Sequence, residues 1–280
     1  MPKQLFTNTQ NMKRLLFLVC LLTTLSARSQ SQLGDVATIS MTSTNLDSSL
    51  AVYAKLGFSK IAANDYPFHW AQVSDGSLLI TLRNDAVAAI SLSYFADDLD
   101  KVIAQLEKNG VSFFQRPKEG DPLRRYLIKS PDGLTIAVSS NIGGFKQPTG
   151  TTLLNMKPGD FNDPSKYPNP QCGAFGEFAQ PVADLATSIA FWAKLGFTVK
   201  SQMKTPYPFA ILTDGKMLIG LHQDKQFSSP TITYFGVNTA KRVQALKDNG
   251  LTHFTEVMGA GNQALLTWEG QHFFLFSLGM

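Results

Sequence analysis

Between residues 54 and 58 the chain reads AKLGF, and the same five letters return at residues 193–197. Upstream of each copy, apolar residues recur at the spacing of one face of a helix. Each pattern starts after a residue that favours a helix N-terminus, Asn45 in the first copy and Asp184 in the second. The glycine of each copy stands where a left-handed residue ends a helix. The repeat therefore predicts one helix that occurs twice within a larger duplicated unit.

The similarity continues beyond the helix. DGSLLITL at 75–82 corresponds to DGKMLIGL at 214–221, and ISLSYF at 90–95 corresponds to TITYF at 231–235. These segments are rich in β-branched and aromatic residues that alternate near period two, which predicts strands, and the Asp-Gly pairs predict hairpin turns. Within each copy the predicted order is strand, helix and three short strands, then the same again. The expected class is α+β, with tandem βαβββ units, two per module in two modules.

The modules are predicted at 33–140 and 173–280. Residues 141–172, between them, are rich in proline and glycine and show neither the helical nor the strand period, which predicts a connector. A period this long indicates domain duplication and not a solenoid. We expect the two modules to pair with each other inside one chain, so that oligomerisation is not required.

The N-terminal segment has the pattern of a signal peptide. From Met12, which would also serve as a start, two basic residues precede an apolar stretch over 15–25 and then small residues. That stretch is short for a membrane span, so a membrane anchor or a buried helix is the less favoured interpretation. We expect residues 1–29 to be removed after Ser29 and the mature protein to be secreted or periplasmic.

The net charge and the cysteine content limit which binding partners and which covalent links the sequence predicts. Removing residues 1–29 takes away four of the 25 Lys and Arg and none of the 21 Asp and Glu, which leaves 21 of each. A chain without net charge offers no basis for binding nucleic acid or anionic membranes. Cys172 is then the only cysteine, so no internal disulfide forms, and its place in the connector favours an incidental thiol over a nucleophile.

The helix motif S-x₃-[YW]-x₂-LGF, the SPDG turn at 130–133 and the twofold order of elements resemble the vicinal oxygen chelate superfamily, which includes glyoxalases, bleomycin-resistance proteins and extradiol dioxygenases. The resemblance covers nearly all of the chain outside the connector and residues 1–29. It implies strands that curl around a cup-shaped pocket. In enzymes of the superfamily, His, Gln or Glu side chains on inward-facing strand positions hold a divalent metal in that cup.

Carried onto this chain, the four ligand positions of each module hold few donors. They are Thr38, Thr81, Ser91 and Ala137 in the first module, and Glu177, Gly220, Thr231 and Phe274 in the second. A stable divalent site needs about three protein donors, or two and the substrate, and only Glu177 is a good one. The resemblance therefore predicts the cup without the metal and without another cofactor. The best remaining metal or acid–base set is Glu177 with His272 and His222.

The aromatic residues on the predicted strands would line the cup instead. They are Phe68, Trp70, Tyr94, Phe209, Tyr234, Phe274 and Phe276. Such a lining suits a flat or apolar ligand, although for each ring taken singly the favoured interpretation is that it fills the cup as part of a core. The preferred hypothesis is a secreted, metal-free protein that binds a small aromatic or apolar molecule, as bleomycin-resistance-like proteins do. The first alternative is a metal-dependent lyase, isomerase or dioxygenase with a rearranged site around Glu177. The second alternative is a non-catalytic structural or interaction module whose cup is filled.

Overall fold

The computed structural model describes residues 31–85, 87–224, 228–256 and 263–277. The predicted signal peptide, residues 1–29, lies outside the described residues. Among the helices that the structure describes, none is long and apolar enough to cross a membrane.

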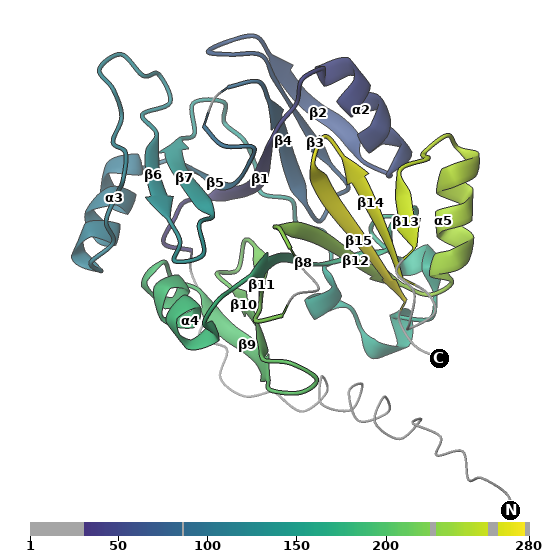
Figure 1. The fold of residues 1–280 in the computed structure, drawn as a ribbon. Coiled ribbons are helices and arrows are strands. Elements are labelled where there is room, and N and C mark those ends of the chain that lie inside the picture. The colour runs from purple at the N-terminus through teal and green to yellow at the C-terminus, as the bar shows by residue number, and fades with distance from the viewer. Residues whose placement is uncertain (1–30, 86, 225–227, 257–262, 278–280) are drawn as a thin grey trace, which may run out of the picture.

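The first module is one mixed sheet of seven strands with two helices (Figure 1). Its elements are β1 (Val36–Thr42), α2 (Leu46–Lys55), β2 (Ser59–Asn64), β3 (Trp70–Ser74), β4 (Leu79–Arg83), β5 (Ile90–Ala96), α3 (Leu99–Lys108), β6 (Tyr126–Lys129) and β7 (Thr135–Ser140). The strand order is β2-β3-β4-β1-β5-β7-β6. Strand β1 runs parallel to β4 and antiparallel to β5, so the two halves of the module meet at its centre.

The second module repeats this arrangement in an eight-stranded sheet of order β13-β14-β15-β12-β8-β11-β10-β9. Its elements are β8 (Ala174–Pro181), α4 (Leu185–Lys194), β9 (Thr198–Met203), β10 (Phe209–Thr213), β11 (Leu218–His222), β12 (Thr231–Gly236), α5 (Thr239–Asp248), β13 (Phe254–Glu256), β14 (Gln263–Trp268) and β15 (Gln271–Ser277). The predicted α+β class, with two modules of open, cup-like mixed sheets, is confirmed.

One predicted strand is reduced in the first module. Three strands were expected after the second helix, but only β6 and β7 follow α3, and Gln115 forms an isolated bridge to Leu127. The segment between α3 and β6 contains Pro117 and Pro122, which cannot donate a backbone hydrogen bond to a neighbouring strand. The second module lacks these prolines at the corresponding place and keeps its third strand, β13.

The repeated helices begin and end as their sequence predicts. The Asn45 side chain accepts from the Ser48 amide at 2.9 Å, and the Asp184 side chain accepts from the Thr187 amide at 2.7 Å. Gly57 and Gly196 follow the last turns with φ of 87° and 91°, in the left-handed region that favours glycine.

The connector runs between the modules and contacts both. It contains three short 3-10 turns, over Leu153–Asn155, Pro158–Asp160 and Pro164–Lys166. Nearer its start, Gln147 accepts from the Ala37 amide at 2.7 Å and donates to the Lys216 carbonyl at 3.2 Å. One side chain thus joins the first strand of one module to a turn of the other.

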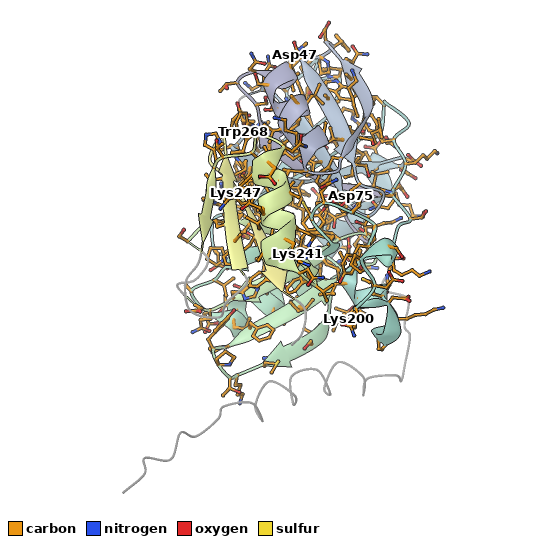
Figure 2. All side chains as sticks on the ribbon, turned by 90° about the vertical axis from the view of Figure 1, so that its right-hand side faces the viewer. Asp47, Asp75, Lys200, Lys241, Lys247 and Trp268 are labelled. Atoms are coloured by element: carbon orange, nitrogen blue, oxygen red, sulfur yellow. The ribbon has the colours of Figure 1, made fainter. Side chains whose placement is uncertain are left out.

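The two modules pair through two reciprocal hydrogen bonds, one buried and one partly buried. Tyr94 of the first module donates to Asp214 of the second at 2.7 Å, and Tyr234 of the second donates to Asp75 of the first at 2.5 Å. Both carboxylates belong to the Asp-Gly turns of the sequence repeat, and Asp75 lies between the modules in Figure 2. Because a buried carboxylate needs its hydrogen-bond donors, these turns bind the modules together as well as closing hairpins.

A second reciprocal contact joins each module's last hairpin to the other module's first helix, as Figure 1 shows for the green α4 beside β6 and β7. Asp132 accepts from the Ala183 amide at 2.9 Å and from the Ser188 hydroxyl at 2.5 Å. Its counterpart Glu269 accepts from the Thr44 amide at 2.9 Å and from the Ser49 hydroxyl at 2.6 Å. Trp268, beside the helix that carries Asp47 in Figure 2, donates to the same hydroxyl at 3.3 Å. Carboxylates at helix N-termini are stabilising.

The Glu269 contact predicts a dependence of stability on pH. Partial burial raises the pKa of Glu269, but hydrogen bonds from Ser49 and Thr44 outweigh it and leave the pKa below its ordinary value. A depressed folded-state pKa contributes stability above the unfolded pKa of about 4.3, and that stability is lost as pH falls through the lower folded value. Glu269→Gln is expected to cost about 1 kcal/mol of unfolding free energy at neutral pH. The difference from wild type should shrink in urea titrations below about pH 4.

Glu119→Gln is the control, because this exposed carboxylate lies in a loop of the first module. Its unfolding free energy should follow the wild type at both pH values. A Glu269→Gln deficit that is equal at neutral and acid pH would show that the carboxylate charge does not stabilise the module contact.

Candidate functional site in the second module

In each sheet, alternate residues share a face, and the inner face is the one that carries the predicted ligand positions. In the first module these positions are buried and bonded among themselves. Thr38 Oγ1 lies 3.0 Å from Thr81 Oγ1, and Thr38 also donates to the Leu79 carbonyl at 3.1 Å. Ser91 Oγ lies 3.3 Å from Ser93 Oγ. Ala137 brings a methyl group to the same face, so this module offers no carboxylate or imidazole at any of the four positions.

The first module's inner face already holds a cation. Arg83, two residues after Thr81, is 4% exposed and pairs with Asp85, which also pairs with Arg125. Its guanidinium donates to the Ala88 carbonyl at 2.7 Å and to Ser91 Oγ at 3.2 Å. Burial lowers the pKa of Arg83, and the neighbouring Asp85 opposes that effect. A metal ion placed beside this guanidinium would meet like charge, so the first module is not a metal site.

The second module instead brings a carboxylate and an imidazole together. Glu177 on β8 and His222 on the parallel neighbour β11 share the inner face, and His222 Nε2 lies 2.8 Å from Glu177 Oε1. Both side chains are 6% exposed. A paired Glu and His at this depth form either an acid–base pair or part of a metal site.

Gly220 makes room for this pair. A Cβ at Gly220 would lie 2.0 Å from Glu177 Oε2 and 2.6 Å from His222 Nε2. The glycine thus occupies a predicted ligand position and supplies the space into which its two neighbours extend.

One oxygen of the pair has no partner. Glu177 Oε2 is buried without a hydrogen bond, while the Glu177 backbone is held on both sides by Thr233 Oγ1, at 3.0 Å and 3.1 Å. A buried carboxylate oxygen without a donor is costly. This orphaned oxygen next to an imidazole nitrogen is the feature of the site that best fits a bound cation.

The second ring nitrogen of His222 and the face of its imidazole also have neighbours. Its Nδ1 lies 3.2 Å from the hydroxyl of Tyr207, in the loop before β10, and Phe209 stacks on the imidazole with centroids 5.6 Å apart and planes 6° apart. Burial, followed by the charges of Glu177 and Asp224, raises the pKa of Tyr207 to about 12.

His272 does not join the pair. It lies on the inner face of β15, level with Thr231, and its Nδ1 is 3.0 Å from Thr267 Oγ1. Burial lowers the pKa of His272. Thr231 is buried and donates to the Ser229 carbonyl at 3.0 Å. Within the described ranges, no group of three or more His, Cys, Asp or Glu side chains could hold a metal ion. The protein therefore supplies two adjacent donors, Glu177 and His222.

Several of the predicted aromatic residues do meet at this site. Phe274, which is 3% exposed, stacks on Phe276 with centroids 4.3 Å apart, and Phe276 stacks on Phe235 at 4.9 Å. Phe274 also packs against Ala179, two residues along β8 from Glu177. The inner face of the second sheet thus carries two groups of stacked rings, one of Phe235, Phe274 and Phe276 and one of Phe209 with the imidazole of His222.

The other predicted rings lie elsewhere. Tyr94 and Tyr234 are on the opposite faces of their strands, in the core between the modules, where each donates to an aspartate of the other module. Phe68 lies against the guanidinium of Arg125 at 5.4 Å, and Trp70 packs on Phe145 of the connector at 5.4 Å. The alternation of residues along a strand shows which side chains share a face, but not which face lines the cup. The predicted lining therefore combined rings of the inner face with rings that lie elsewhere.

Cys172 takes no part in the site. Its thiol is fully buried, burial raises its pKa well above the ordinary value, and Sγ donates to the Leu56 carbonyl at 3.4 Å. A thiol held in that state is a poor nucleophile.

Neither a protein-family model nor a curated protein sequence matches this chain. Solved structures do. The chain is similar to the E323L mutant of homoprotocatechuate 2,3-dioxygenase from Brevibacterium fuscum, with TM-score 0.54 and 13% identity over 91% of this chain and 73% of that one. It is similar to the homoprotocatechuate 2,3-dioxygenase of Arthrobacter globiformis, with TM-score 0.55 and 14% identity over 89% and 81%. It is also similar to the 2,3-dioxygenase LapB of Pseudomonas sp. KL28, with TM-score 0.53 and 15% identity over 91% and 94%. The chain has the two-module fold of the extradiol dioxygenases of the vicinal oxygen chelate superfamily.

This comparison corrects the preferred functional hypothesis. A secreted, metal-free ligand-binding protein without a cofactor was expected, but the structures that match along nine-tenths of the chain are 2,3-dioxygenases, from the metal-dependent enzymes of the superfamily. The metal-free hypothesis gave most weight to the four family positions, where Glu177 is the one good donor, and less to the alternative set of Glu177 with His272 and His222. His222, two residues after Gly220 on the same face, brings a second donor to Glu177. The period of two in the strand indicates His222, whereas Tyr207 is marked in the sequence only as part of the YPF segment that occurs at 66–68 and again at 207–209.

Proposed function

We propose that this chain is a metal-dependent enzyme of the dioxygenase type, with Glu177 and His222 as the two protein donors of a rearranged site in the second module. The observation that carries this proposal is the buried Glu177 Oε2, which has no hydrogen-bond partner and lies beside the imidazole of His222. The neighbours of the same fold are 2,3-dioxygenases, which favours this reaction class over a lyase or an isomerase.

The residues present fit a divalent cation with an incomplete protein shell. A carboxylate and an imidazole are ordinary ligands of first-row transition metals, and two of them leave positions for substrate and water. A cation held by Glu177 and His222 would take the place of the 2.8 Å hydrogen bond between His222 Nε2 and Glu177 Oε1. The first module cannot substitute, because Arg83 places a positive charge at the equivalent depth.

In this proposal, neighbouring residues position the side chains of Glu177 and His222. Thr233 holds the Glu177 backbone, Gly220 leaves room for the carboxylate, and Phe209 fixes the plane of His222 by stacking. Both side chains of the pair are 6% exposed, and the low dielectric of such an environment strengthens charge interactions at the site. A divalent ion bound there would supply Lewis-acid polarisation of a substrate oxygen.

The proposed substrate is a small aromatic molecule. The neighbouring structures named above include two homoprotocatechuate dioxygenases. In this chain the stacked rings of Phe274, Phe276 and Phe235 make the inner face near Glu177 aromatic, which suits an aromatic ligand. Homoprotocatechuate is therefore the first probe, with oxygen consumption as the readout.

The test is metal content and binding in the wild-type protein and in Glu177→Gln and His222→Gln. After growth in medium supplemented with Fe, Mn, Zn and Ni, the wild type is expected to retain close to one equivalent of one of these metals. Each variant should lose at least tenfold in affinity because it removes one of only two protein donors. Asp65→Asn and His69→Gln serve as matched controls, since Asp65 and His69 form an exposed carboxylate–imidazole pair in the first module.

Metal content that is equal in wild type and both site variants would contradict the proposed site. Wild-type protein that holds less than a tenth of an equivalent of all four metals would contradict the proposed enzyme class. Oxygen consumption is informative only with metal-loaded protein, so the binding measurement comes first.

A further inference from the structure

A tyrosine in a loop is joined to the proposed site from outside the strands. Tyr207 lies between β9 and β10, half-buried, and its hydroxyl is 3.2 Å from Nδ1 of His222. Its ring packs on Phe209 at 5.7 Å and on the imidazole itself at 5.9 Å. The hydrogen-bonded chain therefore runs from Tyr207 through His222 to Glu177.

The direction of these hydrogen bonds follows from what each group can donate. An ionised carboxylate only accepts, so the Nε2–H of a neutral His222 donates to Glu177 Oε1. The Nδ1 atom of that tautomer carries a lone pair and must accept. The Tyr207 hydroxyl, 3.2 Å from Nδ1, is the donor within reach of that lone pair.

A bound cation would reverse this assignment. If His222 coordinates through Nε2, a neutral imidazole carries its proton on Nδ1, and the partner of Nδ1 has to accept. A phenolic hydroxyl can donate in one state and accept in the other, because it has both a proton and lone pairs. A phenylalanine at the same place would keep the ring packing and do neither.

We propose that Tyr207 is the positioning residue of the site: its hydroxyl sets the His222 tautomer and serves both the Glu177-paired and the cation-bound ring. This inference rests on the proposed function and extends it to a residue that is neither a ligand nor on an inner strand face. The sequence repeat supplies a comparison. Tyr66, the tyrosine of the first YPF segment, is 66% exposed, and in that module Arg83 stands at the position equivalent to His222.

The experiment compares wild type, Tyr207→Phe and Tyr66→Phe in two measurements. In the metal-free protein, ¹⁵N NMR of the imidazole nitrogens, assigned through His222→Gln, reports the His222 tautomer. Wild type and Tyr66→Phe should show the Nε2–H form, and Tyr207→Phe should show a mixture of both tautomers. In a titration with Co²⁺ followed by its visible absorption, Tyr207→Phe should bind 10- to 100-fold more weakly than wild type, and Tyr66→Phe should bind equally.

The two measurements separate the possible failures. Tyr207→Phe with the wild-type tautomer and the wild-type Co²⁺ affinity overturns the role of Tyr207. A wild type that binds no Co²⁺ overturns the proposed function, and the tautomer measurement then still decides whether Tyr207 controls His222. A merely structural role would not change the tautomer, and unchanged thermal unfolding of Tyr207→Phe shows that the variant is folded.

Discussion

Gly220→Ala is expected to separate Glu177 from His222 and to abolish cation binding in the second module. The added Cβ would lie 2.0 Å from Glu177 Oε2 and 2.6 Å from His222 Nε2, far inside van der Waals contact. Because β11 is paired on both sides, with β10 and β8, the backbone cannot withdraw, and the carboxylate has to leave its position. Overpacking of this kind costs about 1–3 kcal/mol of unfolding free energy.

The measurement is Co²⁺ affinity together with urea unfolding. Gly159→Ala is the control, because a Cβ there would meet no atom within 4 Å and its φ is not in the left-handed region. That control should match wild type in both measurements. Gly220→Ala that binds Co²⁺ with wild-type affinity would show that the Glu177–His222 pair is not where the cation binds.

Asp214→Ala is expected to lose about 3–5 kcal/mol of unfolding free energy, the largest stability effect predicted for this chain. Asp214 is fully buried and accepts from the Tyr94 hydroxyl at 2.7 Å and from the amides of Lys216 and Met217, both at 2.9 Å. Truncation leaves two buried donors and one partly buried donor without this acceptor at the contact between the modules. The pKa of Tyr94 is raised by its complete burial and then by the charge of Asp214.

Tyr94→Phe should cost less, because Asp214 keeps its two backbone donors and no buried charge is abandoned. Asp248→Ala, at an exposed aspartate of α5, should stay within about 0.5 kcal/mol of wild type. Unfolding followed by both tryptophan fluorescence and circular dichroism should give one coincident transition, because the hydrophobic core is continuous across the two modules. Two separated transitions in wild type would contradict a shared core.

The elements of this fold were predictable because the information for them is local. Helix caps such as Asn45 and Asp184, the left-handed glycines after each helix and the Asp-Gly turns act within a few residues, and they were found where the repeat predicted them. The missing strand after α3 is a local effect as well, since the prolines at 117 and 122 block it. The two prolines outweigh the strand preference of the residues around them.

The chemistry of the site was less predictable, because it depends on which strands become neighbours. His222 is 45 residues from Glu177 in the chain, and the two meet only because β8 and β11 pair in parallel with this register. Gly220 looks like a lost ligand in the sequence and is the space for the carboxylate in the structure. Tyr207 reaches His222 from a loop whose path no periodicity describes.

The sequence by itself determined the duplication, the order of helices and strands, and the place of the connector, because those follow from short-range backbone preferences and periodicity. Only the tertiary structure decided which module carries a candidate site. In the first module the buried Arg83 pairs with Asp85, which also pairs with Arg125, whereas Glu177 keeps an unpartnered oxygen beside His222 in the second. Pairing of charges across strands is a property of register and burial, which residues distant in the chain acquire only when the sheets form.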